Sequence, residues 1–275
     1  MSVVDPYGMT DRLDNELLQV IVTRLEVRGN NPSFERMLHE YLDAMRIEEA
    51  TTVLDMGRGT GVAARAIAHR KGFTGNVTGI DLSPYLVEVA ARLAGEEGVA
   101  DRVEFRAGDT RGLELPDGAF NAVVAHTLLS HVDDPLGVVK EAARVVKPGG
   151  MVGIFDGDYA SLTFSHDDPA RGKAYDEALI SAVVTSPRVM RQMPRLLRKA
   201  GLELVASFPH ILAEIGKGDF WLPAIESFEK LAPKSGAMSE AEARAEALFE
   251  DSEAGVFFGA SNYYGYVARR PPIRS

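Results

Sequence analysis

The stretch Thr51-Thr-Val-Leu-Asp-Met-Gly-Arg-Gly-Thr-Gly61 decides the fold of this chain. A β-branched and apolar run ends in Asp55, and three glycines follow at alternate positions: Gly57, Gly59 and Gly61. Glycine adopts the unusual φ angles of a strand that turns directly into a helix, and its missing Cβ lets a ligand approach the backbone. Residues 62–71 place apolar side chains on one face and end before Gly72, which predicts a helix. This strand, turn and helix are typical of a loop that binds a nucleotide cofactor.

Further strands and helices alternate along the chain. Asn76–Asp81 is a second apolar run that ends in an acid, about 20 residues after the turn, where a ribose-binding carboxylate falls in a βαβ fold. Ser83 and Pro84 then begin a helix as N-cap and first helical residue. Further strands are expected at 102–106, 120–125, 151–155, 202–208 and 255–268. This alternation predicts a parallel sheet covered by helices on both faces.

The segments outside this alternation are expected to be helical or irregular. Leu13, Leu17, Val20 and Ile21 predict one amphipathic helix before the glycine turn, and Asn31-Pro32 begins a second. Residues 157–187 are polar and predict an irregular insertion near the substrate. Helices are expected at 188–200, 219–231 and 239–253, the last with a capping box of Ser239 and Glu242.

The glycine spacing separates two cofactor classes. A dinucleotide loop, Gly-x-Gly-x-x-Gly, would need glycine at position 62, where this chain has Val62. The observed Gly-x-Gly-x-Gly, together with Asp55, Asp81-Leu-Ser-Pro, Gly108-Asp109 and Arg144-Val-Val-Lys-Pro-Gly-Gly150, resembles the class I S-adenosylmethionine-dependent methyltransferases. Within that family, the motif sequences are most similar to those of the small-molecule group that includes quinone-biosynthesis C-methyltransferases. The resemblance covers about Thr51 to Asp156.

The resemblance implies a fold and an activity. The fold is α/β and Rossmann-like: a seven-stranded, mostly parallel sheet with helices on both faces, an antiparallel last strand and an N-terminal helical lid. We expect the lid at 1–48, the cofactor-binding core at 49–208, and a helical insertion with the last strand at 209–275. The implied activity moves a methyl group from S-adenosylmethionine to a carbon, oxygen or nitrogen of a small apolar metabolite, leaving S-adenosylhomocysteine.

The resemblance also implies cofactor contacts. Asp55 and the amides of residues 57–61 would hold the methionine part, Asp81 the ribose hydroxyls, and Asp109 the adenine amino group, because each acid is an acceptor facing a donor. Arg58 stands where the family has a small residue, and it could pair with the cofactor carboxylate, turn into solvent, or crowd the turn. The expected cofactor contacts are Arg28, Asp55, Gly57, Arg58, Gly59, Thr60, Gly61, Asp81, Leu82, Asp109, Thr110 and His126.

Two histidines after the fourth strand are the candidate catalytic residues. His126 ends the strand and His131 follows about one helical turn later, and an imidazole titrates near neutral pH, as a general base requires. A packed His131 without chemistry is the alternative. The expected substrate contacts are Tyr7, Asp156, Asp158 and Tyr159, and no metal site is expected.

Composition narrows the class of substrate. The net charge is −10, and we see no lysine or arginine cluster that would bind a nucleic-acid backbone. No segment approaches the roughly 20 apolar residues that span a bilayer, so we expect a cytoplasmic protein without membrane insertion. The chain has no cysteine, which excludes disulfides and thiolate metal ligands. The partner is a small-molecule methyl acceptor, and helices around the core are compatible with a homo-oligomer.

Two other functions fit part of the pattern. A protein that binds the cofactor without methylating, as a regulator or a cyclase-like enzyme, would share every motif above. An NAD-dependent oxidoreductase would share the fold, but its glycine loop would need a glycine at position 62, and this chain has Val62 there.

Overall fold

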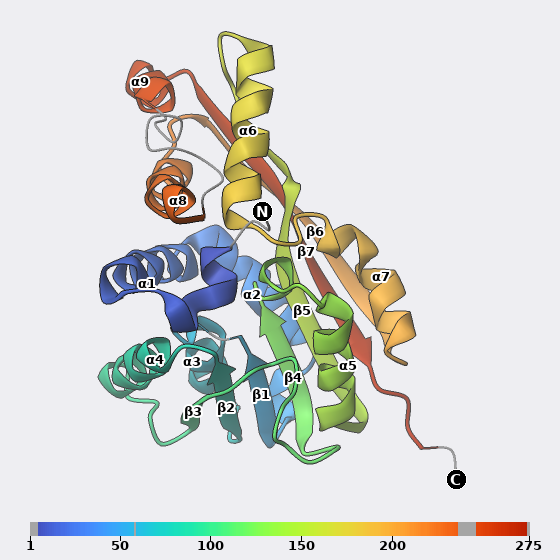
Figure 1. Ribbon diagram of the computed structural model, residues 1–275. Helices are drawn as coiled ribbons and strands as arrows, with labels where there is room; N and C mark the ends of the chain where they lie inside the picture. Colours follow the sequence, from blue (N-terminus) through green and yellow to red (C-terminus); the bar gives the residue numbers. More distant parts are fainter. Residues whose placement is uncertain (1–4, 58, 236–245, 274–275) are drawn as a thin grey trace.

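The computed structural model describes residues 5–57, 59–235 and 246–273, and its centre is one seven-stranded sheet (Figure 1). The strand order is β3-β2-β1-β4-β5-β7-β6. The strands are β1 Thr52–Met56, β2 Asn76–Asp81, β3 Val103–Ala107, β4 Phe120–His126, β5 Val146–Phe164, β6 Glu203–Gly216 and β7 Phe257–Arg269. Only β7 runs against its neighbours β5 and β6. The predicted seven-stranded sheet and its antiparallel last strand are confirmed.

Helices cover both faces of this sheet. On one face α2 and α3 belong to a buried cluster that contains Tyr41 and Ile67, and on the other α5 and α7 belong to a cluster that contains Val138 and Met190. The α-helices are α1 Asn15–Gly29, α2 Pro32–Ala44, α3 Val62–His69, α4 Pro84–Glu96, α5 Pro135–Val145, α6 Pro169–Val183, α7 Val189–Lys199, α8 Trp221–Ser235 and α9 Glu246–Ala254. The 3-10 helices are η1 Pro6–Arg12, η2 Ile47–Glu49 and η3 Leu129–His131.

The N-terminal segment forms the two expected helices. Asp14 caps α1 by accepting from the Leu17 N–H, and Asn31 caps α2 by accepting from the Ser33 N–H. The apolar face of α2 is buried as predicted. The buried face of α1, however, also contains Arg24, a residue that apolar periodicity does not mark.

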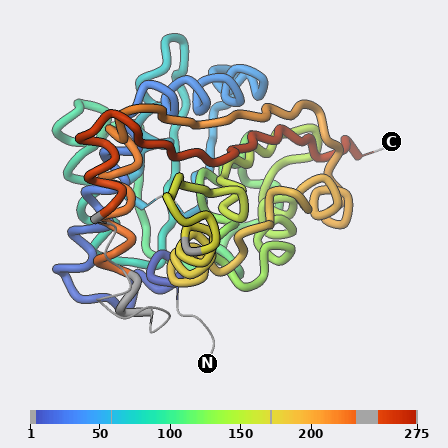
Figure 2. Tube along the Cα trace, turned by 90° about the horizontal axis from the view of Figure 1, so that it is seen from above, coloured from blue at the N-terminus to red at the C-terminus, as the bar shows by residue number. Residues whose placement is uncertain are grey.

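The prediction of an irregular segment at 157–187 is wrong. Strand β5 continues to Phe164, and α6 follows it. Polar and glycine residues made this region look like a loop, but they pair with β7, with Gly157 opposite Tyr263. Figure 2 shows the long traces of β6 and β7 side by side across the molecule. The capping box of Ser239 and Glu242 lies outside the described residues, and the domain bounds at 48 and 208 stay a prediction.

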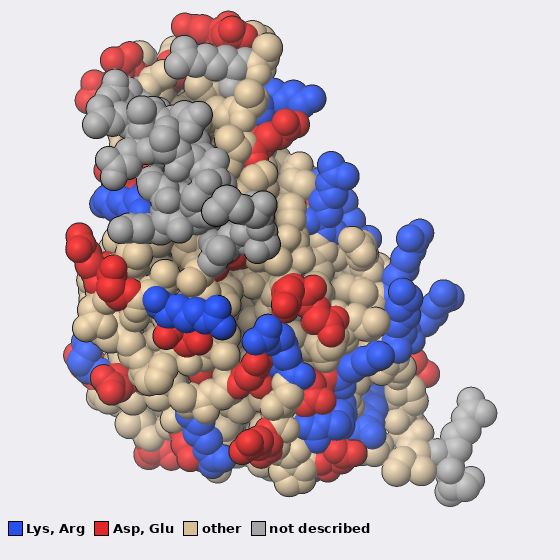
Figure 3. Space-filling view, in the orientation of Figure 1, with Lys and Arg blue, Asp and Glu red and all other residues tan. Residues whose placement is uncertain are grey.

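The expectation that basic residues do not cluster is also wrong. Lys and Arg gather on the side of the molecule over α7 (Figure 3). The exposed basic residues at this helix are Arg188, Arg191, Arg195, Arg198 and Lys199. They fall within the short stretch 188–199, where spacings of three and four residues place most of them on one helix face. Within the described parts of the chain, no helix combines the length and apolarity needed to cross a membrane.

Candidate active site

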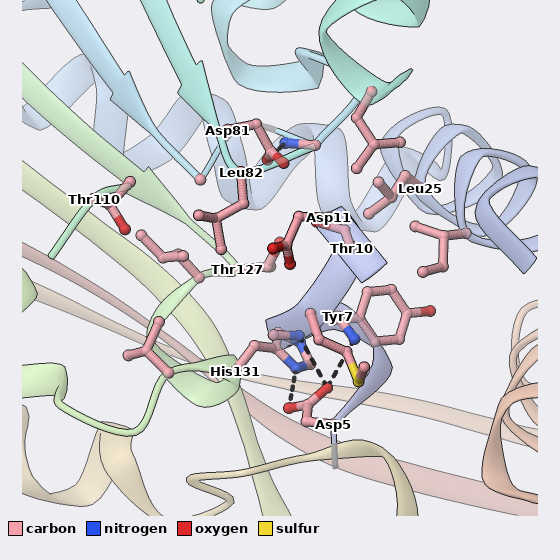
Figure 4. A pocket seen from close by; sticks show the side chains of 18 of the residues that line it. Asp5, Tyr7, Thr10, Asp11, Leu25, Asp81, Leu82, Thr110, Thr127 and His131 are labelled. Carbon is pink, nitrogen blue, oxygen red and sulfur yellow. Dashed lines mark hydrogen bonds and ion pairs between the residues drawn. The ribbon is translucent and has the colours of Figure 1, made fainter. Parts of the chain in front are cut away.

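A cavity of about 490 Å³ lies where β1, β2, β3 and β4 end. Its volume falls in the range of about 300–1,000 Å³ that is usual for small-ligand pockets. Figure 4 shows Asp81 and Leu82 at one end and His131 with Asp5 at the other, and η1 and α1 also contribute to the wall. The predicted residues that line it are Tyr7, Arg28, Asp55, Gly57, Gly59, Thr60, Asp81, Leu82, Asp109, Thr110, His126 and His131.

The glycine turn lines the cavity with backbone atoms, because Gly57 and Gly59 have no side chain. Gly57, Gly59 and Gly61 have φ angles of +63°, +53° and +82°, the left-handed region that favours glycine. A Cβ at Gly57 would lie 2.4 Å from Leu128 Cδ1, so the turn also has no space for a side chain there. Gly61 does not line the cavity and is instead the N-cap of α3. Arg58 lies outside the described residues.

Two buried carboxylates hold the turn in place. Asp55 accepts a hydrogen bond of 3.1 Å from the Ala64 N–H, which ties β1 to α3. Asp81 accepts from the Gly59 N–H at 2.8 Å and from the Ser83 N–H at 3.1 Å. The acid at the end of β2 thus binds the backbone of the turn after β1 and still lines the cavity.

Asp109 is part of an exposed ion pair. Arg111 donates to both of its oxygens at 2.8–3.1 Å and reaches Asp133 at 3.2 Å. These hydrogen bonds from Arg111 lower the pKa of Asp109. Thr110 is buried beside them. Sequence reasoning missed Arg111, although its position directly after the Asp-Thr pair was visible.

The loop after β4 contains a strained residue. Thr127 has a φ of +57°, which is unfavourable for a β-branched side chain. Its N–H donates to the Phe155 carbonyl at 2.6 Å, and its Oγ1 accepts from Arg28 Nη2 at 2.7 Å. Arg28 of α1 therefore connects the N-terminal helices to the loop that follows β4.

His126 is held between aromatic residues. Its ring stacks on Phe155 with centroids 4.8 Å apart, and its Nδ1 lies 3.0 Å from the Tyr41 hydroxyl. Burial, with a smaller contribution from Arg28, lowers the pKa of His126 to about 3. His126 is thus neutral and a weak base at physiological pH.

His131 forms a buried pair with Asp5. The His131 Nδ1 lies 2.9 Å from Asp5 Oδ2, and Tyr7 covers the imidazole with ring centroids 4.8 Å apart. The Thr185 N–H and hydroxyl donate to the same Asp5 oxygen at 2.9 and 3.1 Å. Burial by itself lowers the pKa of His131, but Asp5, by charge and hydrogen bond, and Asp156, by charge, raise it overall. Sequence reasoning missed Asp5 because it lies 126 positions from its partner.

The substrate contacts expected on β5, which are Asp156, Asp158 and Tyr159, lie outside the lining of the large cavity. Asp156 accepts from the Ser130 N–H and hydroxyl, so it fixes the loop that carries His131. Asp158 pairs with Arg191 at 2.8 Å. Among the described residues, neither acid lines the large cavity, because each is buried against its own partner. Tyr159 is 6.0 Å from His131, ring to ring, and faces a smaller cavity next to the first.

Comparison with known proteins agrees with this geometry. Residues 54–154 match the family model described as a methyltransferase domain. A sterol 24-C-methyltransferase of Aspergillus fumigatus is 39% identical over 118 residues, which are 43% of this chain and 31% of that protein. The chain spans no more than about two thirds of the length of the curated relatives that head the comparison.

Solved structures share the fold. The cyclase SpnF superposes with a TM-score of 0.63 at 20% identity, over 99% of this chain and 100% of that one. Geranyl diphosphate methyltransferase, solved with S-adenosylmethionine, has a TM-score of 0.53 at 20% identity, over 98% and 96% of the two chains. Residues 54–154 are therefore a methyltransferase domain, and the chain has the fold of structures solved as S-adenosylmethionine-dependent methyltransferases.

The cavity fits the cofactor of this class, S-adenosylmethionine. Gly57 and Gly59 expose backbone to the cavity, where the methionine part can bind, the N-terminus of α3 favours a negative group, and Asp81 offers carboxylate oxygens to hydroxyl donors. Leu82 and Leu86 supply an apolar wall.

Proposed function

We propose that this protein transfers a methyl group from S-adenosylmethionine to a small, largely apolar acceptor. The observation that carries the proposal is the position of the Asp5–His131 pair, which lines the same cavity as Asp81 from the opposite end. One end of the cavity can then hold the cofactor while the other holds the acceptor. The sterol methyltransferase relative supports an apolar acceptor, as do the aromatic side chains of Tyr7 and Tyr159 near His131.

When bound, S-adenosylmethionine supplies an electrophilic methyl group on a sulfonium. The protein's first contribution is to hold the acceptor atom in line with that group, which can lower the barrier by roughly 7–11 kcal/mol. The second is proton removal. Asp5 engages His131 Nδ1, so Nε2 is the atom that accepts a proton from a carbon or hydroxyl acceptor. His126, with its pKa of about 3, is a poor base, and it contributes to the proposal only as part of the cavity wall.

The N-terminal segment covers the reaction site in this proposal. Asp5 and residues 7–12 line the large cavity, and a Cβ at Gly8 would lie 2.5 Å from the His131 carbonyl oxygen. Such close packing means that η1 excludes water only while it stays seated on the His131 loop. This supports the lid role for the first part of the chain.

Two measurements test the function. Calorimetric titration with S-adenosylhomocysteine, with NADH as the control, is expected to show binding of the former alone. Incubation of S-adenosylmethionine with candidate acceptors is then expected to yield a product heavier by one methyl group. A rearranged product of unchanged mass would instead favour the cyclase reading, which the shared fold of SpnF keeps as the second candidate. NADH binding would favour an oxidoreductase.

A further inference from the structure

A second, small cavity of about 10 Å³ adjoins the large one. The two share Tyr7, Arg28 and His131 in their walls. The small cavity provides about the space that one water-sized group needs. We call the part of the large cavity around Asp5 and His131 the acceptor end, and the part around Gly59 and Asp81 the cofactor end. The small cavity therefore extends the acceptor end beyond His131.

Arg24 lines this extension with a buried guanidinium. The residue is only 5% exposed, and its Nη1 has no hydrogen-bond partner among the described residues. The guanidinium lies over the Phe220 ring, 4.3 Å from the centroid. Burial, opposed mainly by Tyr7, lowers the pKa of Arg24 to about 10, so the group still carries its charge at neutral pH. A buried cation with an unmade hydrogen bond is costly, and a ligand anion would satisfy it.

Arg28 lies one helical turn further along α1 and lines both cavities. Its Nη2 donates to the Thr127 hydroxyl, and no ion pair to a carboxylate within 4.0 Å is present for either arginine in the described parts of the chain. Asp5 and Asp156, two acids whose charges act on Tyr7 and Tyr159, are engaged by His131 and by Ser130. Among the described residues, neither guanidinium group is therefore paired directly with a carboxylate.

Phenol groups complete the surroundings of the extension. Tyr7, Tyr159 and Tyr263 all line it. Burial raises the pKa of Tyr263 to about 12 and raises the pKa values of Tyr7 and Tyr159 as well. All three therefore stay protonated and can donate hydrogen bonds to an anion.

We propose that Arg24 and Arg28 bind an anionic group of the methyl acceptor, a carboxylate or a phosphate. The inference rests on the proposed function, because it assigns the substrate class to the same site. The acceptor is then amphipathic: its anion lies at Arg24, its reacting atom faces His131, and its apolar part fills the rest of the large cavity. The extension has room for one oxygen of that anion, and a carboxylate, planar and compact, can place one oxygen there more easily than a phosphate can.

The rival role for Arg24 is to bind the carboxylate of the cofactor. Arg24 does not line the large cavity, and Gly59 and Asp81 of the cofactor end do not line the small one. This separation assigns Arg24 to the acceptor.

Calorimetry on protein saturated with S-adenosylhomocysteine tests the proposal. Octanoate and pyrophosphate are the probes, titrated into wild type, Arg24→Gln and Arg24→Lys. The matched control is Arg36→Gln, an exposed arginine of α2. We expect wild type and the control to bind at least one probe, octanoate more tightly, and Arg24→Gln to bind it about tenfold or more weakly. Arg24→Lys, which keeps the charge without the fork, should lie between them.

Several results would overturn the anion site. Absence of probe binding to wild type would do so, as would equal binding by Arg24→Gln. Weaker binding of S-adenosylhomocysteine by Arg24→Gln would assign the residue to the cofactor. If wild type fails to bind S-adenosylhomocysteine at all, the proposed function fails first, which separates the two outcomes.

Discussion

The two ends of the large cavity are built in opposite ways. The cofactor end consists of the last residues of β1 and β2 and the loops that directly follow them, and it contains the acids Asp55 and Asp81 with backbone amides. The acceptor end combines residues from distant parts of the chain, and its charged groups are Arg24, Arg28 and the Asp5–His131 pair. One end is thus specified by local backbone geometry, and the other by tertiary contacts between side chains.

This difference determines which substitutions each end of the cavity tolerates without loss of the fold. The turn at the cofactor end needs left-handed φ angles and empty space, so nearly any side chain there is harmful. The acceptor end depends on buried charges that are only partly compensated, and these cost stability. We infer that substitutions at the acceptor end act on the reaction more than on the fold.

The largest effect should come from His131→Gln. Loss of a general base lowers kcat by about 10² to 10⁴, while the affinity for S-adenosylhomocysteine should stay unchanged because the residue lies at the other end of the cavity. Methyl transfer to an accepted substrate is the measurement, and the exposed histidine variant His69→Gln is the control. Unchanged kcat would show that His131 is a packed residue and that the acceptor atom arrives deprotonated.

Asp81→Ala should act on the cofactor end instead. It removes two charge-assisted hydrogen bonds, from the Gly59 and Ser83 N–H groups, together with the expected contact to ribose. We expect about 100-fold weaker binding of S-adenosylhomocysteine by calorimetry. The exposed Asp101→Ala is the control. Binding within threefold of wild type would mean that Asp81 serves only the turn and that the cofactor contacts lie elsewhere.

Local pattern was sufficient to predict the strands, the glycine turn and the helix that form the cofactor end, while the cofactor contacts themselves stay a prediction. Strand, glycine turn and helix follow each other within one stretch, and β2 was predicted at its observed bounds, Asn76–Asp81. The pattern failed where pairing overrode local appearance, as in the polar part of β5 that binds β7. It also could not reveal Asp5 or Arg24, because their partners are assembled only by the tertiary fold.

Gly57→Ala tests whether both the left-handed φ angle and the contact with Leu128 exclude a side chain from the turn. The left-handed φ costs about 1–2 kcal/mol, and the contact with Leu128 Cδ1 adds about 1–3 kcal/mol to the loss of unfolding free energy. Gly72→Ala is the matched control, since its φ is +91° but its Cβ would meet open space. Chemical denaturation measures both variants. Equal losses would show that only the φ angle matters at Gly57.

The pH dependence of kcat/KM tests the charge at the acceptor end. His131 must be unprotonated to act as a base, and its pKa is raised above 6.5, so activity should rise with pH through that raised value. Asp5→Asn removes the negative charge and the hydrogen bond that do most to raise the pKa of His131, so the acid limb should move to lower pH. The pair stabilises the fold below pH 6.5 and loses this contribution as pH rises through the folded pKa, so the stability deficit of Asp5→Asn should be largest at low pH.

Asp11→Asn is the control for that shift, because Asp11 lies in the same segment and lines the cavity without contacting His131. An acid limb that does not move in Asp5→Asn would mean that another group sets the pH profile.

The smallest effect should come from Arg111→Gln, although this arginine also lines the cavity. Its side chain is 47% exposed, and its ion pairs with Asp109 and Asp133 are screened by solvent, so each contributes no more than about 1 kcal/mol. Unfolding free energy should fall by less than 1 kcal/mol, and S-adenosylhomocysteine affinity should change by less than about threefold, as for the exposed control Arg106→Gln. The same change should free Asp109 to accept from the adenine amino group, so a gain in affinity would support the predicted contact. A tenfold loss would instead make Arg111 a direct ligand of the cofactor, and the cofactor end would then depend on a charged side chain as the acceptor end does.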